Sequence, residues 1–130
     1  MEIIKILVVD DEEEICALIR SFLVKRGYAV FTANNIAGAV DLVKKESPKL
    51  ALLDVRLGDE SGMDALQKIK EIDKNIKVIM VTALGDEESI RQAKSLGADD
   101  YITKPFTATY LNDLIVQKIA NLSLKDRNRN

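Results

Sequence analysis

Five short apolar runs, separated by segments with helical spacing, constrain the fold of this chain more than any other feature of its sequence. The runs are rich in β-branched and aliphatic residues, which is typical of strands covered on both faces. They occupy residues 3–9, 28–33, 50–53, 77–81 and 100–103. Because strands alternate with helices through short connections, the pattern predicts a parallel sheet with helices on both faces, the doubly wound three-layer α/β class.

The segments between the runs carry the signals of amphipathic helices. The first segment opens with three acidic residues, which the helix dipole favours. Its expected inward face comprises Ile15, Leu18, Ile19, Phe22 and Leu23. Asn34 and Asn35 are suitable caps for the second segment and Ser61 for the third. The expected inward residues of the third are Met63, Leu66, Ile69 and Ile72.

The fourth and fifth helical segments differ in the width of their apolar faces. The fourth runs over residues 86–97, and its apolar face consists only of Ile90, Ala93 and Leu96. Such a thin face predicts weak docking and mobility. The last helix is expected over residues 111–122, with a polar stretch over 121–130 that frays. We therefore assign residues 1–122 to one domain and residues 123–130 to a polar tail or the start of a linker.

Composition limits the classes of function. The chain has 130 residues, 47% of them apolar and 31% charged, with a formal net charge of −2, which is typical of one soluble globular domain. This balance predicts no direct binding of nucleic acid. The apolar runs are far too short for a membrane span, and we expect no signal peptide because Met1-Glu2 leads directly into the first strand. We expect a cytoplasmic protein. The single cysteine, Cys16, is expected to be a packed thiol, and the absence of histidine excludes histidine-based catalysis and histidine metal ligands.

Residues with complementary chemistry follow four of the five runs. They are Asp10, Asp11, Asp54, Thr82 and Lys104. In a parallel sheet all strand exits lie at one edge, so these side chains can converge. Close carboxylates repel one another unless a cation lies among them, and a site made only of oxygen ligands suits Mg²⁺ or Mn²⁺.

An ammonium group and a hydroxyl beside such a site favour transfer of a phosphoryl group onto a carboxylate, because that reaction needs positioning and charge neutralisation. The nucleophile would be Asp54. Each motif alone has an ordinary structural explanation. Asp10 and Asp11 can cap a helix, residues 12–14 can be a solvated first turn, and Lys104–Pro105 can form a turn.

Four motifs together resemble the receiver domains of two-component response regulators. The motifs are Val8-Val9-Asp10-Asp11, Leu53-Asp54-Val55-Arg56-Leu57, Val81-Thr82-Ala83 and Tyr101-x-x-Lys104-Pro105-Phe106. The resemblance covers about residues 4–122. It implies a flavodoxin-like fold whose five core strands have the order 2-1-3-4-5, which brings the first and third strand exits into one crevice.

The resemblance also implies a role for each position. Asp54 would accept a phosphoryl group from a phosphohistidine on a histidine kinase or a histidine phosphotransfer protein. The direct ligands of Mg²⁺ would be Asp11, Asp54 and the backbone carbonyl of Arg56, with Asp10 acting through water. The phosphoryl oxygens would contact Lys104, the Thr82 hydroxyl, and the backbone N–H groups of Arg56 and Ala83.

The same resemblance implies a switch. Thr82 would move toward the phosphoryl group and Tyr101 would turn inward. The face made by the fourth helix, the fifth strand and the last helix would then bind an output partner, an effector domain or a second copy of the chain. The Lys104–Pro105 bond is expected to be cis. We expect no turnover enzyme, only self-phosphorylation and autodephosphorylation.

The chain departs from the commonest family pattern at Gly58, where many members have proline, and at two positions that in the family tune the lifetime of the phosphoryl group. Arg56 lies two residues after Asp54, and Leu84 two residues after Thr82. We hypothesise that bulky Arg56 and apolar Leu84 hinder the attacking water and slow hydrolysis.

Three alternative functions fit parts of the sequence. One is a docking module of the same fold that works without phosphorylation. Another is a phosphatase with an aspartyl-phosphate intermediate, but the second acid expected two residues after the nucleophile is absent, because that position is Arg56. The third is a flavin-binding electron carrier, for which the acidic residues 10–14 would repel the phosphate.

Overall fold

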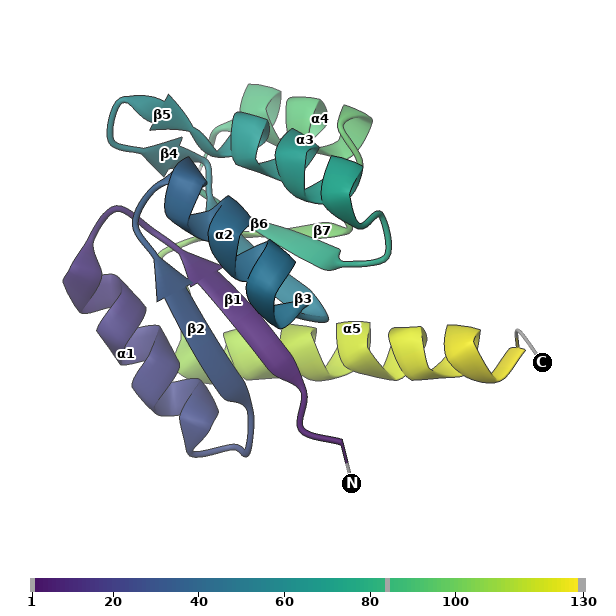
Figure 1. The fold of residues 1–130 in the computed structure, drawn as a ribbon. Coiled ribbons are helices and arrows are strands. Elements are labelled where there is room, and N and C mark those ends of the chain that lie inside the picture. Colours follow the sequence, from purple (N-terminus) through teal and green to yellow (C-terminus); the bar gives the residue numbers. More distant parts are fainter. Residues whose placement is uncertain (1, 84, 129–130) are drawn as a thin grey trace.

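The computed structural model of the chain describes residues 2–83 and 85–128. Its centre is a parallel sheet of five strands in the order β2-β1-β3-β6-β7 (Figure 1). The strands are β1 (Lys5–Val9), β2 (Ala29–Ala33), β3 (Leu50–Asp54), β6 (Lys77–Ala83) and β7 (Asp100–Lys104). The helices are α1 (Glu13–Val24), α2 (Ile36–Glu46), α3 (Gly62–Ile72), α4 (Glu87–Ser95) and α5 (Ala108–Asn128). The predicted class and strand order are confirmed.

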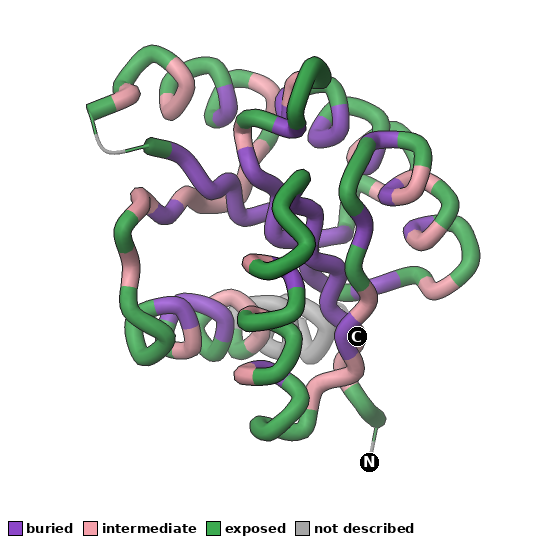
Figure 2. The backbone as a smooth tube through the Cα atoms, turned by 90° about the vertical axis from the view of Figure 1, so that its left-hand side faces the viewer, coloured by how far each residue is buried: buried purple, intermediate pink, exposed green. Residues whose placement is uncertain are grey.

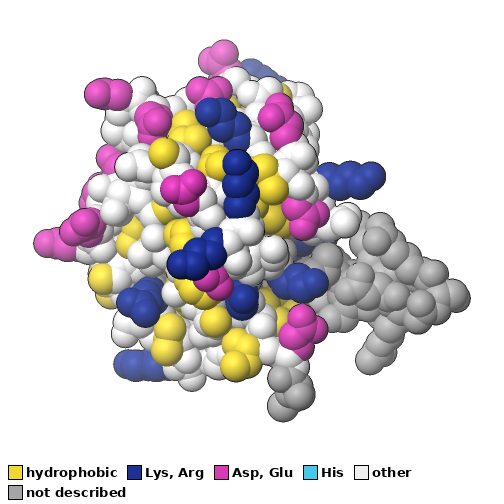
Figure 3. Space-filling view, in the orientation of Figure 1, with side chains coloured by type: hydrophobic (Ala, Val, Ile, Leu, Met, Phe, Trp, Pro, Cys, Tyr) yellow, Lys and Arg dark blue, Asp and Glu magenta, His cyan; other side chains and the backbone are white. Residues whose placement is uncertain are grey.

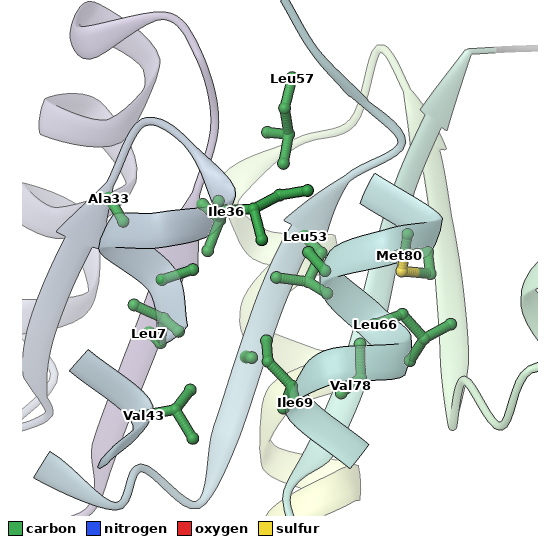
Figure 4. Close-up of a cluster of buried hydrophobic side chains, with 14 of the residues drawn as sticks. Leu7, Ala33, Ile36, Val43, Leu53, Leu57, Leu66, Ile69, Val78 and Met80 are labelled. Atoms are coloured by element: carbon green, nitrogen blue, oxygen red, sulfur yellow. The ribbon is translucent and has the colours of Figure 1, made fainter. Parts of the chain in front are cut away.

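Two apolar clusters, one on each face of the sheet, hold these layers together. Alternate residues of β1 divide between them, because successive side chains of a strand point to opposite faces. Leu7 belongs to the cluster that includes residues of α2, α3 and α4, whereas Val8 belongs to the cluster that includes residues of α1 and α5. Figure 2 shows the buried strands at the centre and exposed residues along the outer sides of the helices, and Figure 4 shows the first cluster.

The parallel register brings the ends of β1, β3 and β6 together. Val9 of β1 pairs with Leu53 of β3, and Asp54 pairs with Val81 of β6. The chain leaves β1 toward β2 on one side and leaves β3 toward β6 on the other. A crevice therefore opens where the winding reverses, between the exits of β1 and β3.

A two-stranded antiparallel ribbon, which the sequence pattern did not predict, follows β3. It consists of β4 (Arg56–Leu57) and β5 (Glu60–Ser61), joined by a turn in which Gly58 has a φ of 62°. Two-residue strands are too short for alternation of apolar and polar residues to be recognised. The ribbon leads directly into α3.

Most helix starts follow the expected capping chemistry. Side-chain oxygens of Asn35, Ser61 and Asp86 accept hydrogen bonds from the first turns of α2, α3 and α4. Asn34, the other expected cap of α2, instead donates a hydrogen bond to the carbonyl of Asp10 at 3.0 Å. This bond ties the exit of β2 to the exit of β1.

Three expectations about the helices are corrected. Leu18 is 68% exposed, because it lies beside a groove between α1 and the start of α5 that no other element of the described chain fills. Ile72, at the last residue of α3, is 39% exposed. The last helix continues to Asn128 instead of ending at residue 122, since no glycine or proline follows to stop it.

The thin apolar face of the fourth helix is confirmed. Ala93 is the one buried residue of α4, while Ile90 and Leu96 are only partly covered. On the side of the molecule seen in Figure 3, acidic and basic side chains are interspersed, as on an ordinary solvated surface. Among the described residues, no helix combines the length and the apolar character needed to cross a bilayer.

Candidate functional site

A buried pair of carboxylates and a lysine form the centre of the site at the strand exits. Asp10 is 4% exposed and Asp54 8% exposed. The Nζ atom of Lys104 lies 2.7 Å from Oδ2 of Asp54 and 3.8 Å from Oδ2 of Asp10. The structure therefore brings together residues at the ends of β1, β3 and β7 that are far apart in the sequence, as the pattern of strand exits predicts.

The backbone around Asp54 is held on both sides. The N–H of Arg56 donates to Oδ1 of Asp54 at 3.0 Å, and the N–H of Val55 donates to the carbonyl of Val81 at 2.9 Å. The start of α3 passes so close that a Cβ atom on Gly62 would lie 1.9 Å from the carbonyl oxygen of Asp54. Only glycine fits at this position without a shift of backbone atoms.

The charges of the site shift the pKa values of its members. Burial, partly opposed by the hydrogen bond from the Glu12 N–H and reinforced by the neighbouring Asp54 carboxylate, raises the pKa of Asp10 to about 6. Burial opposes protonation of Lys104, but the carboxylates of Asp54 and Asp10 outweigh it and hold the pKa of the lysine above its ordinary value. The pocket thus concentrates negative charge that one lysine only partly offsets.

Three acidic residues offer ligand atoms for a divalent cation. One carboxylate oxygen from each of Asp10, Asp11 and Glu12 lies within 4.8 Å of the others. An all-oxygen donor set of this kind fits Mg²⁺ or Mn²⁺. Asp54 is not a member of this trio, although Lys104 bridges it to Asp10.

Glu12 is not among the candidates that the sequence predicts, because residues 12–14 fit a solvated first turn. The signal that could have revealed it is its place directly after Asp10 and Asp11 at the exit of β1. The N–H of Glu12 donates to Oδ1 of Asp10 at 2.9 Å, which bends the chain and returns the Glu12 side chain toward the other two carboxylates.

Thr82 differs from the charged groups of the site because its side chain makes no hydrogen bond among the described residues. It is 2% exposed. A buried hydroxyl without a partner is costly, so this oxygen is available for a group that enters the site. The neighbouring Ala83 is exposed.

Tyr101 lies on the same face of the sheet as Thr82. Tyr101 pairs in register with Met80, and Met80 and Thr82 are two residues apart in β6, so their side chains share the face covered by α3 and α4. The Tyr101 ring is partly buried, and Nζ of Lys94 in α4 lies 5.3 Å from its centroid. The Lys104–Pro105 bond is cis, as the resemblance implies.

An apolar groove of about 660 Å³ adjoins the site. It runs between α1 and the loop that leads from β7 into α5, and it reaches Lys104 and Ala83 at one end. Its apolar lining includes Ile15, Leu18, Ile19, Phe22, Pro105 and Phe106. Because Leu18 stands largely exposed beside the groove, an unfilled apolar surface adjoins Lys104.

Cys16 lies beneath the acidic residues. It is 3% exposed, its thiol lies 3.5 Å from the carbonyl of Asp10, and burial raises its pKa. The expectation of a packed thiol is confirmed. Together with Asn34, Cys16 supports the backbone at the exit of β1.

The comparisons with known proteins agree on one family. Residues 6–116 match the sequence model of the response regulator receiver domain. The chain is 40% identical over 111 residues to the sporulation initiation phosphotransferase F of Bacillus subtilis, and this match covers 85% of the chain and 90% of that protein.

Solved structures agree with this match. A CheY-like receiver domain protein from Methanospirillum hungatei has a TM-score of 0.91 and 30% sequence identity, over 95% of this chain and 99% of that one. NtrX from Brucella abortus has a TM-score of 0.92 and 30% identity. The match to NtrX covers 98% of this chain but 30% of that protein, so the present chain corresponds to one part of the longer NtrX chain.

Proposed function

Because the chain belongs to the response regulator receiver domain family of two-component systems, we propose that Asp54 is its phosphoacceptor. The observation that carries this proposal is the buried Asp54 carboxylate at the exit of β3, 2.7 Å from Lys104 and beside the acidic residues at the exit of β1. The donor would be a phosphohistidine on a histidine kinase or a histidine phosphotransfer protein in the cytoplasm.

The reaction transfers a phosphoryl group from nitrogen to oxygen. A carboxylate oxygen of Asp54 attacks phosphorus, the bond between phosphorus and the histidine nitrogen breaks, and an acyl phosphate forms. The ammonium group of Lys104 neutralises charge on a phosphoryl oxygen. The N–H groups of Arg56 and Ala83 and the unpartnered Thr82 hydroxyl supply further donors. The chain thereby modifies itself once and does not turn over a separate substrate.

Mg²⁺, or Mn²⁺, would be held by Asp10 and Asp11 together with Asp54 and the carbonyl of Arg56, and Glu12 would extend the acidic rim. When bound, the cation supplies charge neutralisation that lets several carboxylates and a phosphoryl group occupy one crevice. The fit of the donor set supports this assignment, because the trio of residues 10–12 offers only oxygen ligands.

The same residues provide a route from the phosphoryl group to the surface. A phosphoryl group on Asp54 gives the Thr82 hydroxyl a partner, and movement of Thr82 frees space on the face that Tyr101 shares. The thin face of α4 lies over this region, so little docking energy opposes its displacement. The surface of α4, β7 and α5 would then bind an output partner or a second copy of the chain.

The apolar groove beside the site supports contact with the phosphodonor protein. A donor whose phosphohistidine reaches Asp54 must also cover the surface next to Lys104 and Ala83, which is one end of the groove. An apolar helix of the donor that packs against the exposed Leu18 would bury this surface.

The lifetime of the acyl phosphate is expected to depend on Arg56, whose side chain is exposed at the rim of the site. Arg56→Asn should accelerate dephosphorylation, since a smaller side chain leaves more room for the attacking water. Leu84 lies outside the described residues, and the same expectation for Leu84→Glu is drawn from the sequence alone. Equal dephosphorylation rates in wild type and Arg56→Asn would remove the hypothesis for Arg56.

The direct test is to incubate the chain with Mg²⁺ and acetyl phosphate and to measure its intact mass. Wild type should gain the mass of one phosphoryl group, Asp54→Asn should gain none, and peptide mapping should place the group on Asp54. Asp59→Asn removes an exposed carboxylate from the same loop and serves as the matched control. No gain of mass in wild type, or an equal gain in Asp54→Asn, would contradict the proposal and favour a docking module that works without phosphorylation.

A further inference from the structure

One side chain ties the β4–β5 ribbon to the helix beside it. The backbone N–H of Ile36, at the first residue of α2, donates to Oε1 of Glu60 at 3.0 Å. Figure 1 shows the ribbon directly beside this end of α2. Glu60 therefore satisfies an N–H group that the helix itself cannot use, and its negative charge lies at the favourable end of the helix dipole.

The ribbon needs anchors of this kind because its own pairing is minimal. Its ladder has two positions, Arg56 with Ser61 and Leu57 with Glu60. An isolated pair of strands is marginal in water even when it is longer. The Leu57 side chain is buried in the same cluster as Ile36, and both are labelled in Figure 4. The start of α2 and the ribbon thus share an apolar cluster in addition to the hydrogen bond that Glu60 accepts.

The ribbon in turn places a group that acts on the phosphoacceptor. The N–H of Arg56, the first residue of β4, donates to Oδ1 of Asp54 at 3.0 Å. Arg56 faces Ser61 across the ladder, and Ser61 is the direct neighbour of Glu60. If Glu60 is displaced, the neighbouring Ser61 is displaced with it. The pairing of Ser61 with Arg56 then transmits this displacement to the Arg56 amide.

We propose that Glu60 is a positioning residue, which holds the Arg56 backbone in register with Asp54 by anchoring the ribbon to α2. This inference rests on the proposed function, because it deepens the role of the same site. Donor placement matters to the rate of phosphoryl transfer, since a misplacement of about 1 Å can cost about a hundredfold.

The experiment compares Glu60→Ala and Glu60→Gln with wild type, and Asp59→Ala serves as the control. Asp59 is the preceding residue of the same turn, is also acidic and exposed, and makes no hydrogen bond through its side chain among the described residues. Three quantities are measured: the ¹⁵N–¹H shift and exchange rate of the Arg56 amide, the rate of phosphorylation by acetyl phosphate, and the urea midpoint.

In Glu60→Ala we expect a shifted Arg56 amide resonance with about tenfold faster exchange, and phosphorylation slower by about tenfold. Glu60→Gln should be intermediate in both, because its amide oxygen still accepts from Ile36 but lacks the charge. The Glu60→Gln variant also allows the test to be carried out if Glu60→Ala folds poorly. Asp59→Ala should match wild type in all three quantities.

A purely structural role for Glu60 would lower the urea midpoint and alter the Ile36 amide, but leave the Arg56 amide and the phosphorylation rate unchanged. That result would overturn the inference. Failure of wild type to take up a phosphoryl group on Asp54 would overturn the proposed function instead. In that case the Arg56 amide in Glu60→Ala still decides whether Glu60 positions the ribbon.

Discussion

Two neighbouring units of strand, loop and helix contribute to the site, and they are held to the sheet very differently. In the first, β3 delivers Asp54 and continues through the ribbon into α3, whose buried residues are Gly62, Met63, Ala65, Leu66 and Ile69. In the second, β6 delivers Thr82 and continues into α4, which buries only Ala93. Both helices cover the same face of the sheet.

The contrast matches the two tasks that the proposed function assigns to the site. Asp54 has fixed partners in Lys104 and the Arg56 N–H, whereas the Thr82 hydroxyl has none among the described residues. On the proposed function, the unit that would accept the phosphoryl group is firmly docked, and the unit that would respond to it is loosely docked. The predictions below test this difference between the units.

The largest expected effect comes from Gly62→Ala. The added Cβ would lie 1.9 Å from the carbonyl oxygen of Asp54, so backbone must move, and we expect a loss of more than about 3 kcal/mol in the free energy of unfolding. Gly85→Ala, in the other unit, adds a Cβ in open space at a φ of 87° and should cost about 1–2 kcal/mol. Urea denaturation measures both, and equal losses would contradict the contrast.

Truncation of an apolar side chain in each helix comes next. Leu66→Ala removes a fully buried side chain from α3 and should cost about 3 kcal/mol. Ile90→Ala removes a partly exposed one from α4 and should cost about 1 kcal/mol, because less apolar surface is buried there. The contrast fails if Ile90→Ala lowers the free energy of unfolding as much as Leu66→Ala.

The sequence predicted the gross form of both units correctly. Apolar runs located the strands, and a parallel sheet places their exits at one edge, so Asp10, Asp54 and Lys104 could be expected to converge. The thin apolar face of α4 could also be predicted, because the helical spacing of the apolar residues shows which of them can be buried. Which neighbour each strand takes came from the family resemblance and not from the residues themselves.

Contacts between short segments could not be predicted in this way. The ribbon has two residues in each strand, and the bond from Ile36 to Glu60 joins residues 24 positions apart. Neither leaves a periodic signal. The exposure of Leu18 has the same origin, because the spacing of apolar residues shows which face is apolar but not whether another element covers it.

The next prediction concerns an ion-pair network at the opposite end of the sheet. Asp99 accepts hydrogen bonds from Lys70 of α3 and from the N–H of Val78 in β6, both at 2.8 Å, and Lys77 lies 3.6 Å away. Burial tends to raise the pKa of Asp99, but the hydrogen bonds from Lys70 and Val78 and the charges of Lys70 and Lys77 outweigh it and lower the pKa below its ordinary value. This network fixes α3 to β6 without involving the body of α4.

Because its folded pKa is lowered, Asp99 contributes stability that is fully present above about pH 4 and is lost as the pH falls through the folded value. Asp99→Asn should therefore cost about 2 kcal/mol at pH 7 and flatten the loss of stability in acid. Urea denaturation between pH 7 and pH 3 measures both effects. An unchanged acid dependence would show that Asp99 does not contribute as described.

The smallest expected effect is a gain of stability. Thr82→Val replaces the buried hydroxyl by a methyl group, which removes an unpartnered polar atom and should raise the free energy of unfolding by about 1 kcal/mol in the unphosphorylated chain. A loss of more than about 1 kcal/mol would show that the Thr82 hydroxyl has a partner in solution, such as an ordered water.

The most direct test of the division between the two units is amide hydrogen exchange with and without the phosphoryl mimic beryllofluoride, in the presence of Mg²⁺. We expect the change in exchange to concentrate in α4, over Glu87–Ser95, while the amides of α3 over Gly62–Ile72 change little. Thr82→Val should suppress the change in α4. Equal changes in both helices, or a change confined to α3, would contradict the account.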